Sequence, residues 1–161
     1  MRQSNINLVN RIRKEYGYSN PIYDIGGGGF KHMWNFPVFS VDISDQADIV
    51  ADCTDMPQVR DNTAATVISC DTFEHVKDPF KAIDEIYRIM KPGGLLILST
   101  VLTWGYHEYP GDYFRYTVEG LEHLCSKFEK LESGWSRENV PLAGTHIEDP
   151  QSGVWYVGRK I

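Results

Sequence analysis

Residues 22–30 read Ile-Tyr-Asp-Ile-Gly-Gly-Gly-Gly-Phe, a short apolar run with an acid near its end, followed directly by four glycines. Such an apolar run is typical of a buried β-strand. The glycines indicate a turn where the backbone comes close to a ligand, because no side chain stands in the way. In doubly wound α/β sheets, cofactors bind at the turn after the first strand. We therefore predict a cofactor site at this turn.

The acid Asp24 separates two kinds of cofactor. A dinucleotide site has the pattern G-x-G-x-x-G, which lets pyrophosphate sit on a helix N-terminus. Gly26 and Gly28 match the first two positions, but Lys31 occupies the third. Asp24 would also bring a negative charge close to the phosphates. A ligand with a cationic amino group fits this turn better.

Composition narrows the class of protein. The 161 residues are enough for one domain with a proper core. The net charge is −6 and no basic run is present, which argues against nucleic acid as a partner. Three widely spaced cysteines suggest reduced thiols in the cytoplasm. No stretch approaches the roughly 20 apolar residues of a membrane span. We expect a single cytoplasmic domain over residues 1–161, with no membrane partner.

Strands and helices alternate along the chain, which predicts a mostly parallel sheet with helices on both faces. The predicted strands cover residues 22–25, 38–41, 49–51, 65–69 and 95–99, and a final antiparallel hairpin covers 128–136 and 154–160. The predicted helices lie within residues 1–20 with Ser4 as cap, after Asp78-Pro79, and after Thr117. Two long connections remain, an aromatic loop at 101–116 and a polar, mobile loop at 137–153. The fold class is thus a single-domain, Rossmann-like α/β sheet.

Several acids fall where predicted strands end. Asp42, Asp52 and Asp71 each follow a strand directly, and Asp24 stands beside the glycine turn. Parallel strands bring their carboxyl ends to one edge of a sheet, so we expect these four acids to gather there. Four acids and a glycine turn at one sheet edge indicate a binding site far more specifically than any one of these residues alone.

The order of these motifs resembles the class I S-adenosylmethionine-dependent methyltransferases, in particular the compact type 11-like group acting on small molecules or glycans. Five segments carry the resemblance: Asp24-x-Gly26-x-Gly28, Val41-Asp42-Ile43-Ser44, Ala51-Asp52-Cys53, Ser69 to Val76, and Met90 to Leu95. The resemblance implies a Rossmann-like fold, S-adenosylmethionine as cofactor, S-adenosylhomocysteine as product, and no metal.

The resemblance also implies the cofactor contacts. Asp42 is expected to accept hydrogen bonds from both ribose hydroxyls, with Ile43 beside it, and Asp52 to accept from the adenine amine. The Cys53 N–H would donate to the adenine ring. Glycine N–H groups suit the methionine carboxylate, and Asp24 suits its ammonium. The expected cofactor-binding residues are Asp24, Gly26, Gly27, Gly28, Asp42, Ile43, Asp52, Cys53, Cys70 and Asp71.

The acceptor should bind at the carboxyl end of the fifth strand, under the 101–116 loop. In the resembling family a His, a Pro and a Tyr-aromatic-Arg-aromatic-Thr run recur there, often in proteins linked to glycan modification. The expected acceptor-binding residues are Trp104, Tyr106, Tyr109, Tyr113 and Arg115. His107 is the candidate base, and a role in holding the loop is an equal alternative. For His75 a structural role is favoured, and for Arg115 the simpler alternative is an ion pair with Asp112.

Three functions compete. The first is methyl transfer, most simply at oxygen, to a small-molecule or sugar acceptor. The second is a degenerate methyltransferase fold that acts as a non-catalytic binding or partner subunit. It is motivated by three departures from the resembling family: Phe30 stands where the family's glycine loop usually has its third glycine, only 18 positions separate Asp24 from Asp42, and few residues before the first strand can cover the acceptor site. So short an N-terminal cover is also compatible with a homodimer. The third, a nicotinamide-dependent reductase, explains Asp42 but lacks a suitably placed Tyr-x-x-x-Lys pair.

Overall fold

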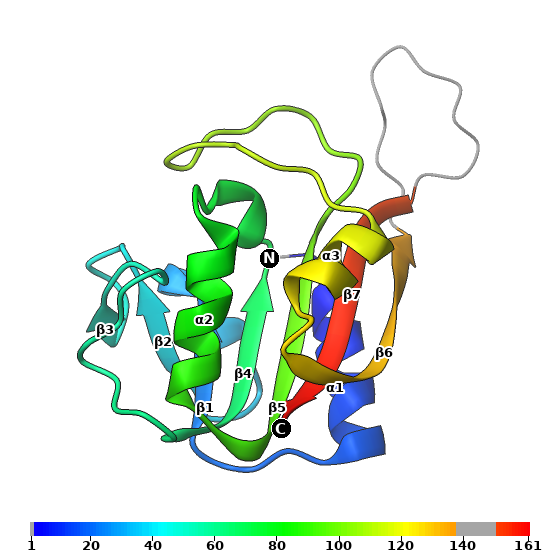
Figure 1. Ribbon diagram of the computed structural model, residues 1–161. Helices are drawn as coiled ribbons and strands as arrows, with labels where there is room; N and C mark the ends of the chain where they lie inside the picture. Colours follow the sequence, from blue (N-terminus) through cyan, green and yellow to red (C-terminus); the bar gives the residue numbers. More distant parts are fainter. Residues whose placement is uncertain (1, 138–150) are drawn as a thin grey trace.

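The computed structural model describes residues 2–137 and 151–161. Its described strands form one seven-stranded sheet in the order β3-β2-β1-β4-β5-β7-β6 (Figure 1). The strands are β1 (Ile22–Ile25), β2 (Phe39–Asp42), β3 (Ile49–Val50), β4 (Ala64–Cys70), β5 (Met90–Val101), β6 (Phe128–Arg137) and β7 (Gln151–Lys160). β1 to β5 are parallel, whereas β7 runs antiparallel to both β5 and β6. The predicted Rossmann-like α/β fold with a C-terminal antiparallel pair is confirmed.

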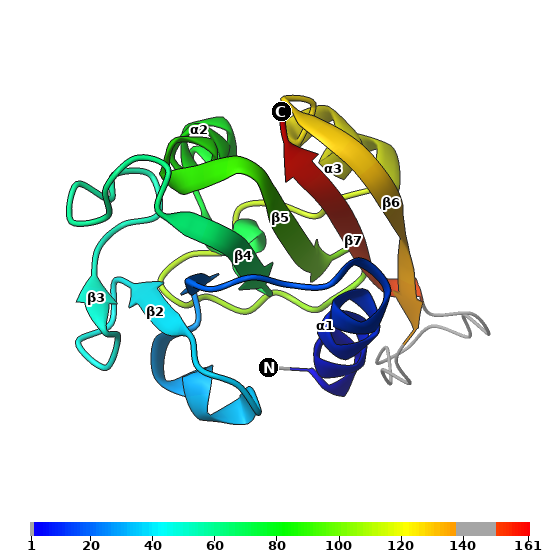
Figure 2. The ribbon, with the colours of Figure 1, turned by 90° about the horizontal axis from the view of Figure 1, so that it is seen from below.

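Helices cover both faces of the sheet. Helix α1 (Gln3–Tyr16) packs on one face, and α2 (Pro79–Ile89) and α3 (Val118–Leu124) pack on the other (Figure 2). Each face has its own apolar core. Leu8, Val9 and Ile12 of α1 join Trp34 and Phe36 on the first face. On the second face the buried residues of α2 and α3 are Ala82, Ile83, Ile86, Ile89, Leu121 and Leu124.

The helix signals read from the sequence have mixed outcomes. Asp78 accepts a hydrogen bond from the Lys81 N–H, and Thr117 from the Gly120 N–H, so both predicted caps are confirmed. The predicted cap Ser4 is wrong, because α1 begins one residue earlier and Ser4 lies inside its first turn. The helix has no side-chain cap; instead, Arg2 at its start reaches the sheet edge.

Some predicted boundaries also differ. The segment after the glycines forms a short 3₁₀ helix, η1 (Gly28–Met33), because too few residues separate β1 from β2 for a longer helix. β3 ends at Val50, and β5 begins five residues earlier than predicted. Of the range predicted as a mobile loop, Arg137 and 151–153 are strand, and 138–150 lie outside the described residues. Among the described helices, α1 is the longest, and none has the length and apolarity needed to cross a bilayer.

The sheet positions the site through its register. Asp24 pairs with Ser40 of β2 and with Ile68 of β4, so the carboxyl ends of three strands lie level with one another. The loop after β5 arches over this edge in Figure 1, and the start of α1 reaches the same edge. A short 3₁₀ helix after β4, η2 (Phe73–His75), lies beneath the loop. Any ligand at this edge is therefore bordered by the glycine turn, η2 and the 101–116 loop.

Candidate functional site

The glycine turn closes tightly around Asp24. The Gly26 N–H donates to the Val41 carbonyl (2.8 Å), which ties the turn to β2. A Cβ built on Gly27 would lie 2.2 Å from Asp24 Oδ2. Gly26 and Gly28 have φ values of +79° and +44°, which side chains disfavour. The turn therefore needs glycine both for its backbone conformation and for its approach to the acid.

Asp24 itself is buried and incompletely paired. Its carboxylate is 1% exposed, and Oδ2 accepts a hydrogen bond of 2.7 Å from the Trp34 indole Nε1–H. Oδ1 is buried without a hydrogen-bond partner in the described part of the chain. Burial, reinforced by the charge of Asp42, raises the pKa of Asp24 to about 6, although the Trp34 hydrogen bond opposes this shift. A cationic amino group beside Oδ1 would supply the missing partner.

Asp42 and Asp52 lie next along the same edge. The Asp42 Oδ1 accepts from the Ser44 N–H (2.8 Å), and its Oδ2 would be 3.3 Å from a Cβ on Gly28. The Ala51 N–H donates to the Asp42 carbonyl (2.9 Å), so the acids after β2 and β3 are neighbours. Asp52 is exposed, and its Oδ1 accepts from the Thr54 N–H and hydroxyl. The structure thus brings together Asp24, Asp42 and Asp52, as the sequence predicts.

The remaining expected cofactor residues flank this row of acids. Ile43 is exposed beside Asp42. Burial raises the pKa of the half-buried Cys53 thiol to about 12, and burial also raises the pKa of the fully buried Cys70 thiol. Both thiols therefore stay protonated and unreactive near neutral pH.

Asp71 is held by the N-terminal segment. Arg2, whose side chain is 9% exposed, donates to both Asp71 oxygens, and the Asn5 amide donates to Oδ2 (2.7 Å). Asn5 in turn accepts from the Ser99 hydroxyl of β5 (2.9 Å). Asp71 lies at the sheet edge as predicted, but its charge is paired within the protein. Arg2 and Asn5 therefore position Asp71. No local sequence pattern indicates either contact, because the two residues lie 69 and 66 positions away from Asp71.

The 101–116 loop is anchored by an internal ion pair. Arg115 donates through both terminal nitrogens to Asp112, whose side chain is 1% exposed. This pairing holds the pKa of Asp112 below its usual range. Arg115 also donates to the Trp104 and Gly105 carbonyls. The simpler expectation for Arg115, an ion pair with Asp112, is confirmed, and this residue shapes the loop.

The aromatic residues of the loop are largely open to solvent. Tyr109 is 83% exposed, Tyr106 is 75% exposed and Tyr113 is 51% exposed. Trp104 is half-buried and lies under the Arg2 guanidinium, 5.9 Å from it. These three exposed tyrosines provide flat apolar faces with hydroxyl groups, a surface on which a sugar ring or another polar ring can stack.

Under the loop lies a cluster formed by Glu74, His75 and His107. The loop is fixed to η2 because the Tyr113 and Phe114 N–H groups donate to the Glu74 carbonyl (2.8 and 3.2 Å). His75 and His107 stack edge to face, 4.8 Å apart between ring centres. Each Nε2 lies 3.9 Å from Oε1 of the fully buried Glu74. The structure therefore places the candidate His107 beside two ionisable groups that are not near it in sequence.

Besides Arg2 and Asn5, sequence reasoning missed two further residues that matter at this edge. Trp34 gives Asp24 its hydrogen bond, and nothing in its position ten residues after Asp24 indicates this contact. Glu74 is buried beneath the loop, although acids in such short polar motifs are normally solvent-exposed. Its place directly before His75, after a strand end, was the signal that could have pointed to it.

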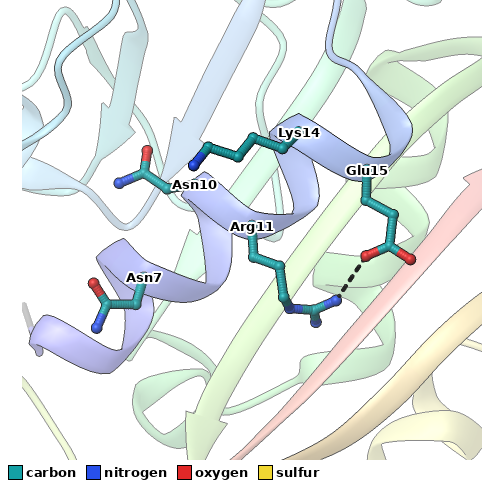
Figure 3. A pocket seen from close by; sticks show the side chains of 5 residues that line it. All are labelled: Asn7, Asn10, Arg11, Lys14 and Glu15. Atoms are coloured by element: carbon teal, nitrogen blue, oxygen red, sulfur yellow. Dashed lines mark hydrogen bonds and ion pairs between the residues drawn. The ribbon is translucent and has the colours of Figure 1, made fainter.

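A surface hollow of about 510 Å³ lies elsewhere, along the outer side of α1 (Figure 3). Its lining side chains are Asn7, Asn10, Arg11, Lys14 and Glu15. Arg11 is paired with Glu15 (3.0 Å) and with Glu132 (2.9 Å), so its charge is already satisfied. None of the predicted site residues lines this hollow, so it is separate from the candidate site.

Comparisons with known proteins agree with the sheet order. A family model described as a methyltransferase domain matches residues 25–98. No match is found among curated proteins. A SAM-dependent methyltransferase from Methanosarcina mazei has a TM-score of 0.68 at 15% identity, over 92% of this chain and 97% of its own. The [4+2]-cyclase SpnF has a TM-score of 0.69 at 14% identity, over 96% of this chain and 80% of its own.

A third similar structure is Haemonchus contortus phosphoethanolamine N-methyltransferase 2 in complex with S-adenosyl-L-methionine. It has a TM-score of 0.64 at 17% identity, over 96% of this chain but only 52% of its own. Likeness at such low identity shows a shared fold.

Proposed function

We propose that this chain, which is a class I S-adenosylmethionine-dependent methyltransferase by its fold and its matching domain, methylates a hydroxyl of a sugar-like or other small acceptor. One observation carries the cofactor assignment. Asp24 lies in β1, Asp42 ends β2 and Asp52 follows β3, so three adjacent strands bring their acids to the edge where the glycine turn closes on Asp24. The resident cofactor and its product would be S-adenosylmethionine and S-adenosylhomocysteine.

The residues at this edge fit that cofactor. The unpartnered Oδ1 of Asp24 suits the methionine ammonium, and the backbone N–H groups of Gly27 and Gly28 suit its carboxylate. Asp42 would accept from the ribose hydroxyls, with Ile43 covering one side of the nucleoside. Asp52 and the Cys53 backbone would meet adenine. Cys70 would line the wall near the sulfonium, and Asp71 would act by fixing the Arg2 side chain there.

The acceptor site would lie between this row and the 101–116 loop. The exposed faces of Tyr106, Tyr109 and Tyr113 support a ring-shaped acceptor, and Trp104 and Arg115 hold the loop in place. Methyl transfer is an in-line displacement, so the main task is to align the acceptor oxygen with the methyl group and exclude water. We assign His107 the task of taking up the hydroxyl proton, because its Nδ1 lies 3.0 Å from the Gly105 carbonyl and so carries the hydrogen, which leaves the Nε2 lone pair to act as the base.

Calorimetry with S-adenosylhomocysteine tests the cofactor assignment. Wild-type protein should bind one equivalent. Asp42→Ala should bind about 10- to 100-fold more weakly, since a hydrogen bond to a charged group contributes about 1.5–3 kcal/mol. Asp45→Ala is the matched control, because Asp45 is an exposed acid three residues away. Absence of binding by the wild type, or equal losses in the two variants, would contradict the proposal.

A non-catalytic role is the second candidate. It is favoured by η1, which has only six residues where the fold can accommodate a full helix, and by Arg2, which already pairs with Asp71 at the edge. A partner subunit would bind S-adenosylhomocysteine weakly and form a stable complex with another chain. Formation of S-adenosylhomocysteine from S-adenosylmethionine by the lone protein, with any hydroxyl acceptor from a panel of sugars and phenols, would exclude this role.

A further inference from the structure

Three hydrogen-bond acceptors face one another beneath the 101–116 loop: the Nε2 atoms of His75 and His107, and Oε1 of Glu74. His75 Nδ1 lies 2.5 Å from the Gly111 carbonyl, and His107 Nδ1 lies 3.0 Å from the Gly105 carbonyl. A carbonyl oxygen can only accept, so each Nδ1 must carry the hydrogen. In the neutral rings each Nε2 is then an acceptor, and both Nε2 atoms face the Glu74 carboxylate.

The carboxylate at the centre of this cluster is incompletely satisfied. Glu74 Oε2 accepts a hydrogen bond of 2.6 Å from the Thr100 hydroxyl. Oε1 is buried without a hydrogen-bond partner among the described residues, and it lies 3.9 Å from each Nε2. Such a distance is too long for a hydrogen bond. A buried carboxylate oxygen facing two further lone pairs is costly unless a cation lies between them.

We infer that Glu74, His75 and His107 form a binding site for a divalent transition-metal ion of the zinc type. One carboxylate and two imidazoles, with room for a fourth ligand, is a donor set that catalytic zinc sites use. The three ligand atoms lie within 4.8 Å of one another. Tetrahedral coordination with bonds near 2.1 Å needs separations of about 3.4 Å. Each Glu–His separation would have to shorten by roughly half an ångström, and the two imidazoles would have to approach each other by up to about 1.4 Å, which rotation of the His107 and His75 rings about their side-chain bonds would supply.

The surroundings of the site are those of a metal centre. The Gly105 and Gly111 carbonyls fix both imidazoles through Nδ1, which sets the tautomer that ligation through Nε2 requires. The Thr100 hydroxyl holds the other oxygen of Glu74. His107 is anchored separately, because its N–H donates to Asp112 (2.8 Å). Each ligand is therefore held by at least one contact outside the cluster.

The use of such an ion rests on the proposed function. An ion held by Glu74, His75 and His107 would stabilise the alkoxide of an acceptor hydroxyl bound to it, so this hydroxyl would lose its proton to solvent more readily than a free one. The oxygen would then form a bond to the methyl carbon while the carbon–sulfur bond breaks and its electron pair returns to sulfur. With the ion bound, His107 would act as a metal ligand and solvent would take the proton, so this role replaces the proton uptake that we assign to His107 in the metal-free protein.

Titration with cobalt(II) and zinc tests the site directly. Chelator-treated wild-type protein should bind one equivalent of zinc by calorimetry, and cobalt(II) should give the intense visible absorption of a four-coordinate site. His107→Ala and Glu74→Gln should weaken binding by more than about 100-fold, since loss of a mere supporting contact already costs 10- to 100-fold. His123→Ala is the control, because this exposed histidine lies on α3, away from the cluster.

The same samples are then titrated with S-adenosylhomocysteine, which shows whether each variant is folded and separates the two proposals. Metal bound without nucleoside would leave the metal site standing and count against the methyltransferase function. Nucleoside bound without stoichiometric metal would overturn the metal site alone. Zinc affinity in His107→Ala and Glu74→Gln equal to that of the wild type would also overturn it.

Discussion

Replacing Asp24 by Asn should stabilise the protein in the absence of its cofactor while weakening cofactor binding. The carboxylate is buried, one of its oxygens has no partner, and Trp34 donates to the other. Asn keeps an oxygen that can accept the Trp34 hydrogen bond and carries no charge to desolvate. The acid therefore lowers folding stability in a way that only a cationic ligand relieves.

The size of this effect follows from the pKa of Asp24. Burial raises it from 3.8 to about 6, a difference of roughly two units, and each unit corresponds to about 1.36 kcal/mol, so the total is about 3 kcal/mol. Because the folded-state pKa is the higher one, the group favours folding most below pH 4. That contribution is lost as the pH rises to about 6 and changes little above it.

Urea denaturation between pH 4 and 8 measures the effect. The free energy of unfolding of Asp24→Asn should match that of the wild type near pH 4 and exceed it by up to about 3 kcal/mol at pH 7. Asp45→Asn, which changes an exposed acid, should show no such trend. S-adenosylhomocysteine should bind Asp24→Asn at least about tenfold more weakly. A stability difference that is absent at pH 7, or equal at pH 4 and pH 7, would refute this account of Asp24.

Three further substitutions test the glycine turn, the hydrogen bond to Asp24 and the N-terminal cap of α3. Gly27→Ala should lower the affinity for S-adenosylhomocysteine by at least about tenfold in calorimetry, because its Cβ would meet Asp24 at 2.2 Å, whereas Gly105→Ala has open space and should not. Trp34→Phe should lower the free energy of unfolding by about 1–3 kcal/mol at pH 7 and by less at pH 4, since the lost indole donor serves the ionised acid. Thr117→Ala should cost about 1 kcal/mol in urea denaturation through loss of the α3 cap, and Thr117→Ser should restore it.

The row of acids and the glycine turn at the sheet edge could be predicted from the sequence, because each part of this candidate site is local. A strand, the acid at its end and the glycine turn are contiguous in sequence, and parallel pairing alone brings Asp24, Asp42 and Asp52 to one edge. The same logic gave the α2 and α3 caps, which are satisfied within three residues. The start of α1 was misjudged because its first residues are fixed by a distant contact, from Arg2 to Asp71.

The acceptor side could be predicted only in part. His107 was found as a candidate from its loop, but its neighbours Glu74 and His75 come from η2, more than 30 positions earlier. The loop between Val101 and Thr117 has no hydrophobic periodicity, so its path is fixed by backbone contacts to Glu74 and by the Asp112–Arg115 pair. Such long-range contacts leave no pattern in a single sequence.

The two halves of the site share one electrostatic design. Asp24 and Glu74 are both buried carboxylates, each with one oxygen held by a neutral donor, Trp34 or Thr100, and one oxygen without a partner. Burial raises the pKa of both. A fold gains nothing from two such groups unless cations complete them, because each uncompensated charge costs stability. Under the two proposals, the ammonium of the methyl donor would supply one cation and a metal ion the other, so binding of each ligand would stabilise the fold by compensating one buried carboxylate.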